Sequence, residues 1–237
     1  MRILITNDDG IEAAGIRKLA EAAKEFGEVW VVAPDGQRSA ASHSYNFHHS
    51  VNLKACPFPV EGVKAYACSG TPVDCVRVGV LKLMPEKPDF VLTGINQGYN
   101  ICADIQYSAT VGSALEATFL GVKAIAFSQG SFKDADIVDR YLTEIMEECM
   151  KADPGKNRIM NVNFPDCSLA ECKGILRNCV VSQDDFYEDT YEEEALDDGS
   201  SEFHLHYKRH WEAASEGTDL MAVRDGYISI GPVSNIM

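Results

Sequence analysis

The sequence predicts an α/β domain built on a mostly parallel β-sheet, and three features of the chain predict it. Apolar runs of strand length alternate with amphipathic stretches of helix length from residue 3 to about residue 165. Residues 3–33 read as strand, helix and strand, which is a βαβ unit with a right-handed crossover. A length of 237 residues is enough for one large domain, or for a core domain with an appendage.

Each predicted element rests on the spacing of apolar residues. Ile16, Leu19 and Ala20 stand at helical spacing, so residues from about 13 to 25 form a helix with one apolar stripe facing a sheet. Residues 29–33 are continuously apolar, as expected for a parallel strand that is covered on both faces. The same reasoning predicts further strands at 63–68, 89–93, 122–127 and 159–164, and further helices at 71–83, 111–119 and 135–150.

Residues 43–62 show little periodicity, and we expect a solvated excursion there rather than a histidine metal site. The helix that follows begins with strong signals, because Thr71 can serve as N-cap, a proline follows it, and Asp74 is placed to close a capping box. Structural capping is sufficient to explain these residues. A helix N-terminus preceded by serine and glycine could also hold an anion.

The composition changes after the last α/β unit. Residues 173–218 crowd acidic side chains between two β-rich pieces, which predicts a protruding hairpin arm with an acidic tip. Such an arm rarely stabilises itself, so we expect it to pack on another subunit, and a mobile acidic flap is the alternative. Residues 219–233 should return to strand-like apolar alternation and rejoin the core. The chain is thus expected to be one domain, with an α/β core (1–172), an arm (173–218) and a C-terminal return segment (219–237).

Composition argues against several classes of function. A formal net charge of −15 disfavours a general nucleic-acid binder, which needs a basic face, but allows small phosphate substrates held by a cation or by backbone N–H groups. No apolar run approaches the roughly 20 residues that cross a bilayer, and no signal peptide precedes the first strand. We therefore expect a cytoplasmic protein that is not bound to membranes and whose eight cysteines are free thiols.

The first strand ends in two adjacent carboxylates, Asp8 and Asp9, followed by a glycine. In open α/β sheets, ligands bind outside the carboxyl ends of the strands. Two neighbouring carboxylates repel each other unless hydrogen bonds or a divalent cation lie between them, and oxygen ligands favour Mg²⁺ or Mn²⁺ over zinc. The alternative is a solvated turn in which one aspartate caps the next helix. Ser39 follows the second strand and lies near this pair if the two strands are neighbours.

The loop between residues 94 and 110 is longer than the ~2–6 residues usual for a connection of this kind. Long loops at the carboxyl end of a strand are more often functional than short ones. This loop ends at Ser108 and Thr110, next to a helix N-terminus where free N–H groups and the helix dipole favour a phosphate. The alternative makes one hydroxyl a simple N-cap, which does not account for the length of the loop.

Six motifs, taken in order, resemble the SurE survival-protein family of metal-dependent nucleotidases and together span most of the chain. They are Asn7-Asp8-Asp9-Gly10, Ala33-Pro34 with Ser39 and Ser42, residues 69–76, residues 94–100, residues 107–112, and Thr218-Asp219 with residues 226–230. The chain departs from the family at Ala109, where glycine is usual, at residues 231–233, and in the acidity of its arm. These departures bear on substrate preference and oligomer geometry more than on the chemistry.

The resemblance implies a Rossmann-like, doubly wound, mostly parallel sheet with a C-terminal β-hairpin extension that swaps between subunits. It also implies hydrolysis of nucleoside 5′- and 3′-monophosphates to nucleoside and phosphate, with one Mg²⁺ or Mn²⁺ per subunit. The protein is then expected to be a homodimer, which the arm could extend to a tetramer.

The resemblance and the predicted site together assign roles to single residues. The implied metal ligands are Asp8, Asp9, Ser39 and Asn96. The two aspartates would also act in catalysis, with Asp9 preferred as the acceptor of a proton from water, and covalent attack by an aspartate as the rival route. The residues expected to bind the substrate phosphate are Asn100, Ser108 and Thr110.

Two other classes of function fit parts of the sequence. One is a receiver-like, magnesium-binding signalling module, since an acidic pair after a first strand also suits aspartyl phosphorylation without turnover. Such a module ends after about one short domain, whereas this chain continues to residue 237. The other is a non-catalytic binding protein that uses the acidic arm.

Overall fold

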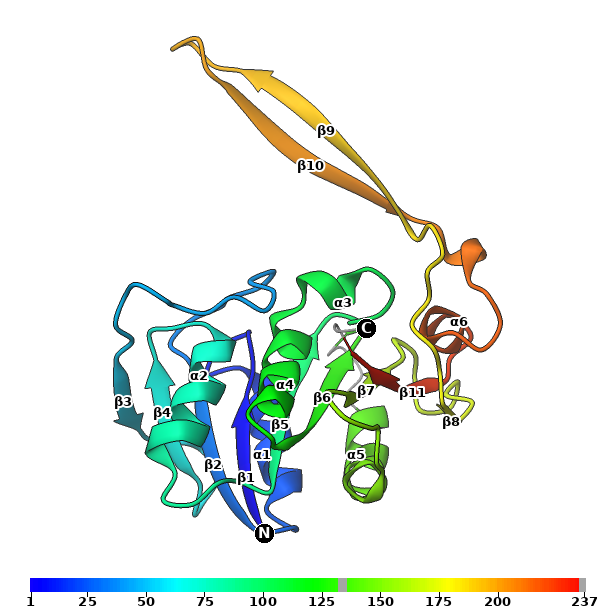
Figure 1. Cartoon of the computed structure of the whole chain (residues 1–237). Coiled ribbons are helices and arrows are strands. Elements are labelled where there is room, and N and C mark those ends of the chain that lie inside the picture. Colours follow the sequence, from blue (N-terminus) through cyan, green and yellow to red (C-terminus); the bar gives the residue numbers. More distant parts are fainter. Residues whose placement is uncertain (132–135, 235–237) are drawn as a thin grey trace.

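The computed structural model describes residues 1–131 and 136–234, and a nine-stranded sheet forms its centre (Figure 1). The strands of this sheet are β1 (Arg2–Thr6), β2 (Glu28–Pro34), β3 (Leu53–Cys56), β4 (Lys64–Cys68), β5 (Phe90–Gln97), β6 (Lys123–Gln129), β7 (Ile159–Phe164), β8 (Ile175–Arg177) and β11 (Ile228–Val233). Their order is β3-β4-β2-β1-β5-β6-β7-β11-β8.

The six strands from β4 to β7 in this order are parallel, while β3 and β11 run antiparallel to their neighbours β4 and β7. The chain builds outward from β1 through β2 and β4, then returns to the other side of β1 and continues through β5, β6 and β7. This reversal makes the sheet doubly wound, and it places a topological switch point between β1 and β5. The predicted α/β class with a doubly wound, mostly parallel sheet is confirmed.

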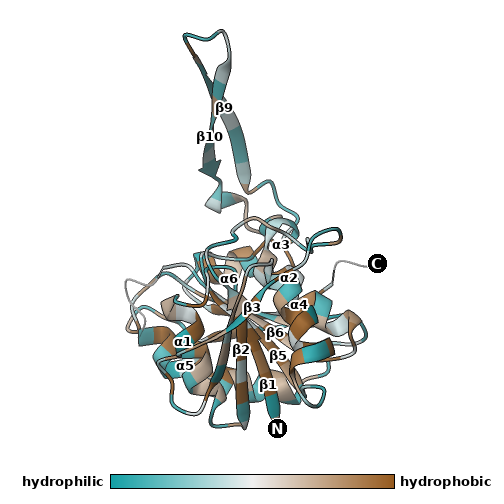
Figure 2. Cartoon of the chain, turned by 90° about the vertical axis from the view of Figure 1, so that its left-hand side faces the viewer, coloured by the Kyte–Doolittle hydropathy of each residue, from teal (hydrophilic) through white to brown (hydrophobic). Residues whose placement is uncertain are grey.

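Helices cover both faces of the sheet. The helical segments are α1 (Ala14–Ala23), α2 (Pro72–Val78), a π-helical turn (Gly79–Leu83), α3 (Asp104–Tyr107), α4 (Ala109–Phe119), α5 (Asp136–Lys151), a 3₁₀ turn (Trp211–Ala213) and α6 (Asp219–Arg224). Ile3 and Ile5 of β1 pack in one core with α1 and α5, while Leu4 between them packs in the other core with α2 and α4. This alternation is the period of two expected for a strand. Figure 2 shows the apolar strands enclosed between these helices.

The predicted capping box at the start of α2 is confirmed. The Asp74 backbone N–H donates to Thr71 Oγ1 at 3.2 Å, and the Thr71 N–H donates to Asp74 Oδ2 at 2.9 Å. The helix was predicted to run to residue 83, but its last turn is π-helical from Gly79 onward. At Gly79 the helix lies so close to β1 that an added Cβ would meet Leu4 Cδ2 at 2.6 Å.

Three of the sequence predictions for local structure are wrong. The loop predicted at residues 94–110 contains the last residues of β5 and the short helix α3. The supposed excursion at residues 43–62 contains β3, a short edge strand whose exposed and half-buried side chains carry no apolar pattern to reveal it. The start of the return segment forms helix α6 rather than strand-like structure, because Thr218 caps it by accepting a hydrogen bond from the Met221 N–H at 3.2 Å. Only β11 fits the predicted strand. Residues 135 and 235–237, to which two of the predicted segments extend, lie outside the described residues.

The predicted hairpin arm is present. Strands β9 (Tyr187–Ala195) and β10 (Ser201–Arg209) pair antiparallel and project away from the sheet (Figure 1). One face of this hairpin carries exposed large apolar side chains, namely Tyr191, Phe203, Leu205 and Tyr207. The opposite face carries glutamates and histidines, among them Glu192 and His204.

No helix in residues 1–131 or 136–234 combines the length and apolar character needed to cross a membrane. Each of the eight cysteines is a free thiol, and five of the eight are buried.

A buried carboxylate fastens the C-terminal segment to the rest of the domain. Asp219, at the start of α6, accepts backbone hydrogen bonds from Ser182 at 2.9 Å, Cys102 at 3.2 Å and Leu220 at 2.8 Å. It thereby joins the segment before the arm to the loop that follows β5. Burial raises the pKa of Asp219 to about 6, although these hydrogen bonds oppose the shift.

This raised pKa predicts a pH-dependent contribution to stability. When a carboxyl group binds its proton more tightly in the folded state, the free energy of unfolding of the protein falls as pH rises from the pKa of the unfolded state to that of the folded state. The free energy of unfolding of Asp219→Asn, relative to wild type, should therefore rise by on the order of 3 kcal/mol from about pH 4 to about pH 6.5. Urea unfolding at several pH values measures this difference. The control is Asp185→Asn, an exposed acid, and the same slope in both variants would contradict the prediction.

Candidate metal and phosphate site

A cavity of about 760 Å³ opens at the carboxyl ends of β1 and β5, at the switch point of the sheet. Five of the seven residues predicted from the sequence line it, namely Asp8, Ser39, Asn96, Asn100 and Ser108. Asp9 and Thr110 do not line the cavity, but each forms a hydrogen bond with a residue that does. Asp9 accepts from the Gln97 N–H, and Thr110 donates to Asp8. The fold thus gathers residues that are up to 102 positions apart in the chain.

Asp8 is a buried carboxylate with 4% of its surface exposed. Its Oδ1 accepts a hydrogen bond from Thr110 Oγ1 at 2.6 Å. Burial raises the pKa of Asp8 to about 6, the Thr110 hydroxyl lowers it, and the charge of Asp9 raises it again. Within residues 1–131 and 136–234, no lysine, arginine or histidine forms an ion pair with either aspartate. Two acidic groups therefore meet in a low-dielectric site without a cationic side chain between them.

Asp9 is half-buried and is held by the neighbouring strand. Its Oδ2 accepts a hydrogen bond from the Gln97 backbone N–H at 3.1 Å, at the end of β5. Burial raises the pKa of Asp9, and this hydrogen bond lowers it. Gln97 lines the main cavity, whereas Asp9 itself lines a smaller hollow beside it.

Ser39 and Asn96 bring two further oxygen atoms to the cavity. The loop that carries Ser39 follows β2 and is tied to β1, because the Arg38 N–H donates to the Asp8 carbonyl oxygen at 2.7 Å. Asn96 Nδ2 donates to the Gly98 carbonyl at 3.0 Å, and its Oδ1 accepts no hydrogen bond from the described residues. Together with Asp8 and Asp9, these residues are the candidate ligands, and each of them offers a side-chain oxygen atom.

Asn100 is held by three polar side chains on the two strands beyond β5. Its backbone N–H donates to Asn163 Oδ1 at 2.8 Å, and its carbonyl accepts from Asn163 Nδ2 at 3.1 Å and from Asn161 Nδ2 at 2.9 Å. Its own Nδ2 donates to Ser128 Oγ at 2.7 Å. All four residues are buried, so this network fixes both the backbone and the side chain of Asn100.

These supporting residues were not predicted from the sequence. The signal was present as polar side chains, Ser128, Asn161 and Asn163, inside strands that otherwise read as apolar. Buried amides and hydroxyls at the carboxyl ends of strands require hydrogen-bond partners, and a functional loop is a natural place to find them.

The two hydroxyls at the start of α4 have different surroundings. Ser108 caps the helix, since its Oγ accepts a hydrogen bond from the Val111 N–H at 3.0 Å, and it also lines the cavity. Thr110 is fully buried, and its hydroxyl proton is donated to Asp8. Thr110 therefore contacts the candidate metal ligand rather than the open cavity.

The far wall of the cavity comes from the base of the arm. The sequence predicted an arm that contacts another subunit, or a mobile acidic flap, but not a wall of the site. This wall contains Tyr187, Asp189, Leu205, Tyr207 and Arg209, and α3 adds Asp104 and Tyr107 beside it. The signal in the sequence was the presence of aromatic residues among the charged ones in both arm strands.

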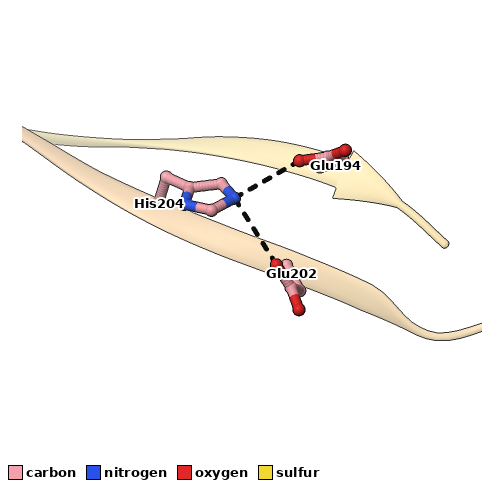
Figure 3. Close-up of side chains that lie close together, drawn as sticks. All are labelled: Glu194, Glu202 and His204. Carbon is pink, nitrogen blue, oxygen red and sulfur yellow. Dashed lines mark ion pairs between the residues drawn. The ribbon is translucent and has the colours of Figure 1, made fainter.

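A separate group of side chains of metal-binding types lies near the arm tip, where Figure 3 shows His204 between Glu194 and Glu202. His204 Nε2 is 3.5 Å from Glu194 Oε2 and 3.8 Å from Glu202 Oε2. All three residues are exposed, and ion pairs between exposed side chains are common on a charged hairpin. These contacts are explained as surface ion pairs.

Comparison with known proteins agrees with the resemblance inferred from the motifs. Residues 3–187 match the family described as "Survival protein SurE". Proteins named "5'-nucleotidase SurE" from Thermoanaerobacter sp. (strain X514) and Clostridium botulinum (strain 657 / Type Ba4) are each 38% identical over 237 residues, covering 98% of this chain and 92% of theirs. The crystal structure of the SurE protein from Aquifex aeolicus is similar with a TM-score of 0.83 and 32% identity, covering 99% of this chain and 93% of that one. This chain therefore belongs to the SurE family.

Proposed function

We propose that this chain is a metal-dependent phosphomonoesterase that hydrolyses nucleoside 5′- and 3′-monophosphates to nucleoside and phosphate. One observation carries the proposal: Asp8 is buried beside Asp9, without a cationic partner among the described residues, in a cavity that also holds a helix N-terminus. The name "5'-nucleotidase SurE" of two 38% identical relatives supports the substrate class.

The donor set suits a hard divalent cation, one per subunit. We propose that Asp8, Asp9, Ser39 and Asn96 hold Mg²⁺ or Mn²⁺, because oxygen ligands and two negative charges match these ions, whereas zinc prefers nitrogen and sulfur. When bound, such a cation neutralises charge on the transferring phosphoryl group and activates the attacking water. It would also offset the cost of burying two neighbouring carboxylates.

The protein side chains would orient the substrate and move one proton. Asn100, held by its buried network, and Ser108 with the first N–H groups of α4 would bind the phosphate oxygens. In our proposal Thr110 acts through Asp8, because its hydroxyl is already donated to that carboxylate.

Asp9 would accept the proton of the attacking water. Burial raises the pKa of Asp9, which brings its basicity closer to that needed near neutral pH. Direct attack by an aspartate is the rival route. It would leave an aspartyl phosphate that rapid acid quenching could trap.

We also propose a cytoplasmic homodimer that the arm can extend to a tetramer. The eight free thiols support a reducing compartment. The exposed apolar face of the arm supports contact with another subunit, since contiguous exposed apolar patches mark interaction sites. The chain would be one domain, with a core at 1–172, an arm at 173–218 and a return segment at 219–237. Within the range 173–218, β8 belongs to the central sheet, where it pairs with β11, and the projecting hairpin begins at Tyr187.

Removing either carboxylate tests the metal site. Asp8→Asn and Asp9→Asn should each weaken Mn²⁺ binding and lower turnover of nucleoside monophosphates by roughly 100-fold or more, because charge stabilisation of the transferring group is lost. The metal-free Asp8→Asn protein should be at least as stable as wild type, since it buries no charge.

Titration calorimetry with Mn²⁺, phosphate-release assays and melting curves measure these three effects. The control is Glu12→Gln, an exposed acid beside the site whose side chain does not line the cavity. Metal affinity and phosphatase activity at wild-type levels in both aspartate variants would refute the site.

The two hydroxyls of α4 should separate into different effects. Ser108→Ala should cost about 1 kcal/mol of stability through the lost cap, and it should raise KM if Ser108 also binds phosphate. Thr110→Val should instead weaken Mn²⁺ binding, because the charged form of Asp8 loses a hydrogen bond. Thr118→Val, at the other end of α4, is the control for helix stability. Unchanged KM in Ser108→Ala would leave that residue as a cap alone.

Shortening the arm tests its role in assembly. Deleting residues 184–202 should reduce the oligomer while leaving a folded core, but it also removes Tyr187 and Asp189 from the cavity wall. Replacing residues 192–204 by Asn-Gly is cleaner, because a two-residue turn would join the paired Tyr191 and Leu205. Light scattering that finds an unchanged oligomer would exclude the arm tip from the interface.

A further inference from the structure

We infer that the base of the arm, together with the end of α3, forms a subsite that binds the nucleobase of the substrate. The inference rests on the proposed nucleotidase function and adds to it the residues that distinguish a nucleotide from a simple phosphate ester. They are Tyr107, Tyr187, Asp189, Tyr207 and Arg209.

The cavity is much larger than a phosphate group requires. Its volume of about 760 Å³ lies in the range of pockets that enclose whole organic ligands. The candidate metal and phosphate residues occupy the sheet side, and the arm forms the opposite wall. A substrate whose phosphate is bound at Ser108 must therefore place its remaining atoms toward Tyr107 and the arm.

The arm presents its aromatic and cationic side chains on the face that borders the cavity. Residues 187 and 189 of β9, and residues 205, 207 and 209 of β10, share one face because side chains alternate along a strand. The register pairs Tyr207 with Asp189 and Arg209 with Tyr187, so these four side chains form a compact cluster.

Two tyrosine rings of this wall are open to a ligand. Tyr107 and Tyr207 are 65% and 58% exposed, and both line the cavity. Tyr187 is more buried and is fixed, since its hydroxyl donates to Asp104 Oδ2 at 2.6 Å and its ring meets Tyr207 edge-on with centroids 6.1 Å apart. A fixed ring beside an open one is a suitable platform for a planar base.

The same cluster also contains a cation and a carboxylate that can interact with a nucleotide. The guanidinium of Arg209 lies 5.3 Å from the ring centroid of Tyr207 and 5.9 Å from that of Tyr187, and it forms no ion pair within residues 1–131 and 136–234. In a chain of net charge −15, this cation in the cavity favours an anionic substrate. The Asp189 carboxylate can accept hydrogen bonds from the amino groups of a base.

These groups predict the class of substrate that binds best. Stacking of a base on an aromatic side chain strengthens binding whichever base is present, and purines offer the larger surface. We therefore expect purine nucleoside monophosphates to bind more tightly than sugar phosphates that lack a base.

A matched pair of substrates tests the subsite. AMP and ribose 5-phosphate share the sugar and phosphate but differ in the base. In Tyr207→Ala the ratio of kcat/KM for AMP to that for ribose 5-phosphate should fall roughly 5- to 100-fold, chiefly through KM for AMP, as expected for one lost stacking partner. Tyr207→Phe, which keeps the aromatic ring, should retain the wild-type ratio. Phe203→Ala is the control, because Phe203 is on the same face of the arm but does not line the cavity.

Calorimetric titration with adenosine in metal-free buffer tests the subsite without any hydrolysis. Adenosine should bind wild type and Tyr207→Phe alike, and its affinity for Tyr207→Ala should fall by a similar factor. If wild type releases no phosphate from either ester, the proposed hydrolysis fails while adenosine binding still decides the subsite. If wild type hydrolyses AMP and ribose 5-phosphate equally well, the nucleobase subsite is overturned and the hydrolytic function stands. The subsite is also overturned if adenosine binds Tyr207→Ala as tightly as it binds wild type.

Discussion

The parallel pairing of β1 with β2 on one side and β5 on the other is the constraint on which the rest of this molecule depends. Ile3 pairs with Val29 and with Phe90, so three strands end at one edge of the sheet. Parallel strands require crossover connections, which here run through helices on both faces and bury all but the ends of the three strands. The loops that follow the three strands are thereby brought together, and each contributes residues to the same cavity.

Ionising both carboxylates of the candidate site is unfavourable, because they are close together and removed from water. Asp8 and Asp9 are adjacent and partly desolvated, and burial raises the pKa of both. Hydrogen bonds from Thr110 to Asp8 and from the Gln97 N–H to Asp9 stabilise the two carboxylates. Among the described residues, no lysine or arginine forms an ion pair with either of them. A site arranged in this way favours a cation from solution, which links the stability of this edge to metal binding.

The arm contributes to two different surfaces. Its base lines the cavity through Tyr187 and Tyr207, while its outer part exposes Tyr191 and Phe203 beyond the cavity. Both sets lie on the same face of one hairpin, because its register continues without a break from residue 187 to residue 209. A contact that another copy makes with the outer part would therefore also restrain the wall of the site.

The sequence by itself determined the strands and helices of the core, the capping box at Thr71, the hairpin, and the candidate residues after each strand, because these depend on apolar periodicity and on groups a few residues apart. It did not reveal β3, whose edge position leaves no apolar pattern. It also did not reveal the short elements α3, β8 and α6. Only the tertiary structure decided that Thr110 donates to Asp8, that Asn163 clamps Asn100, and that Tyr207 lines the cavity. The first two of these contacts join residues that are 102 and 63 positions apart, respectively. They depend on which strands become neighbours, and packing of the whole sheet decides that.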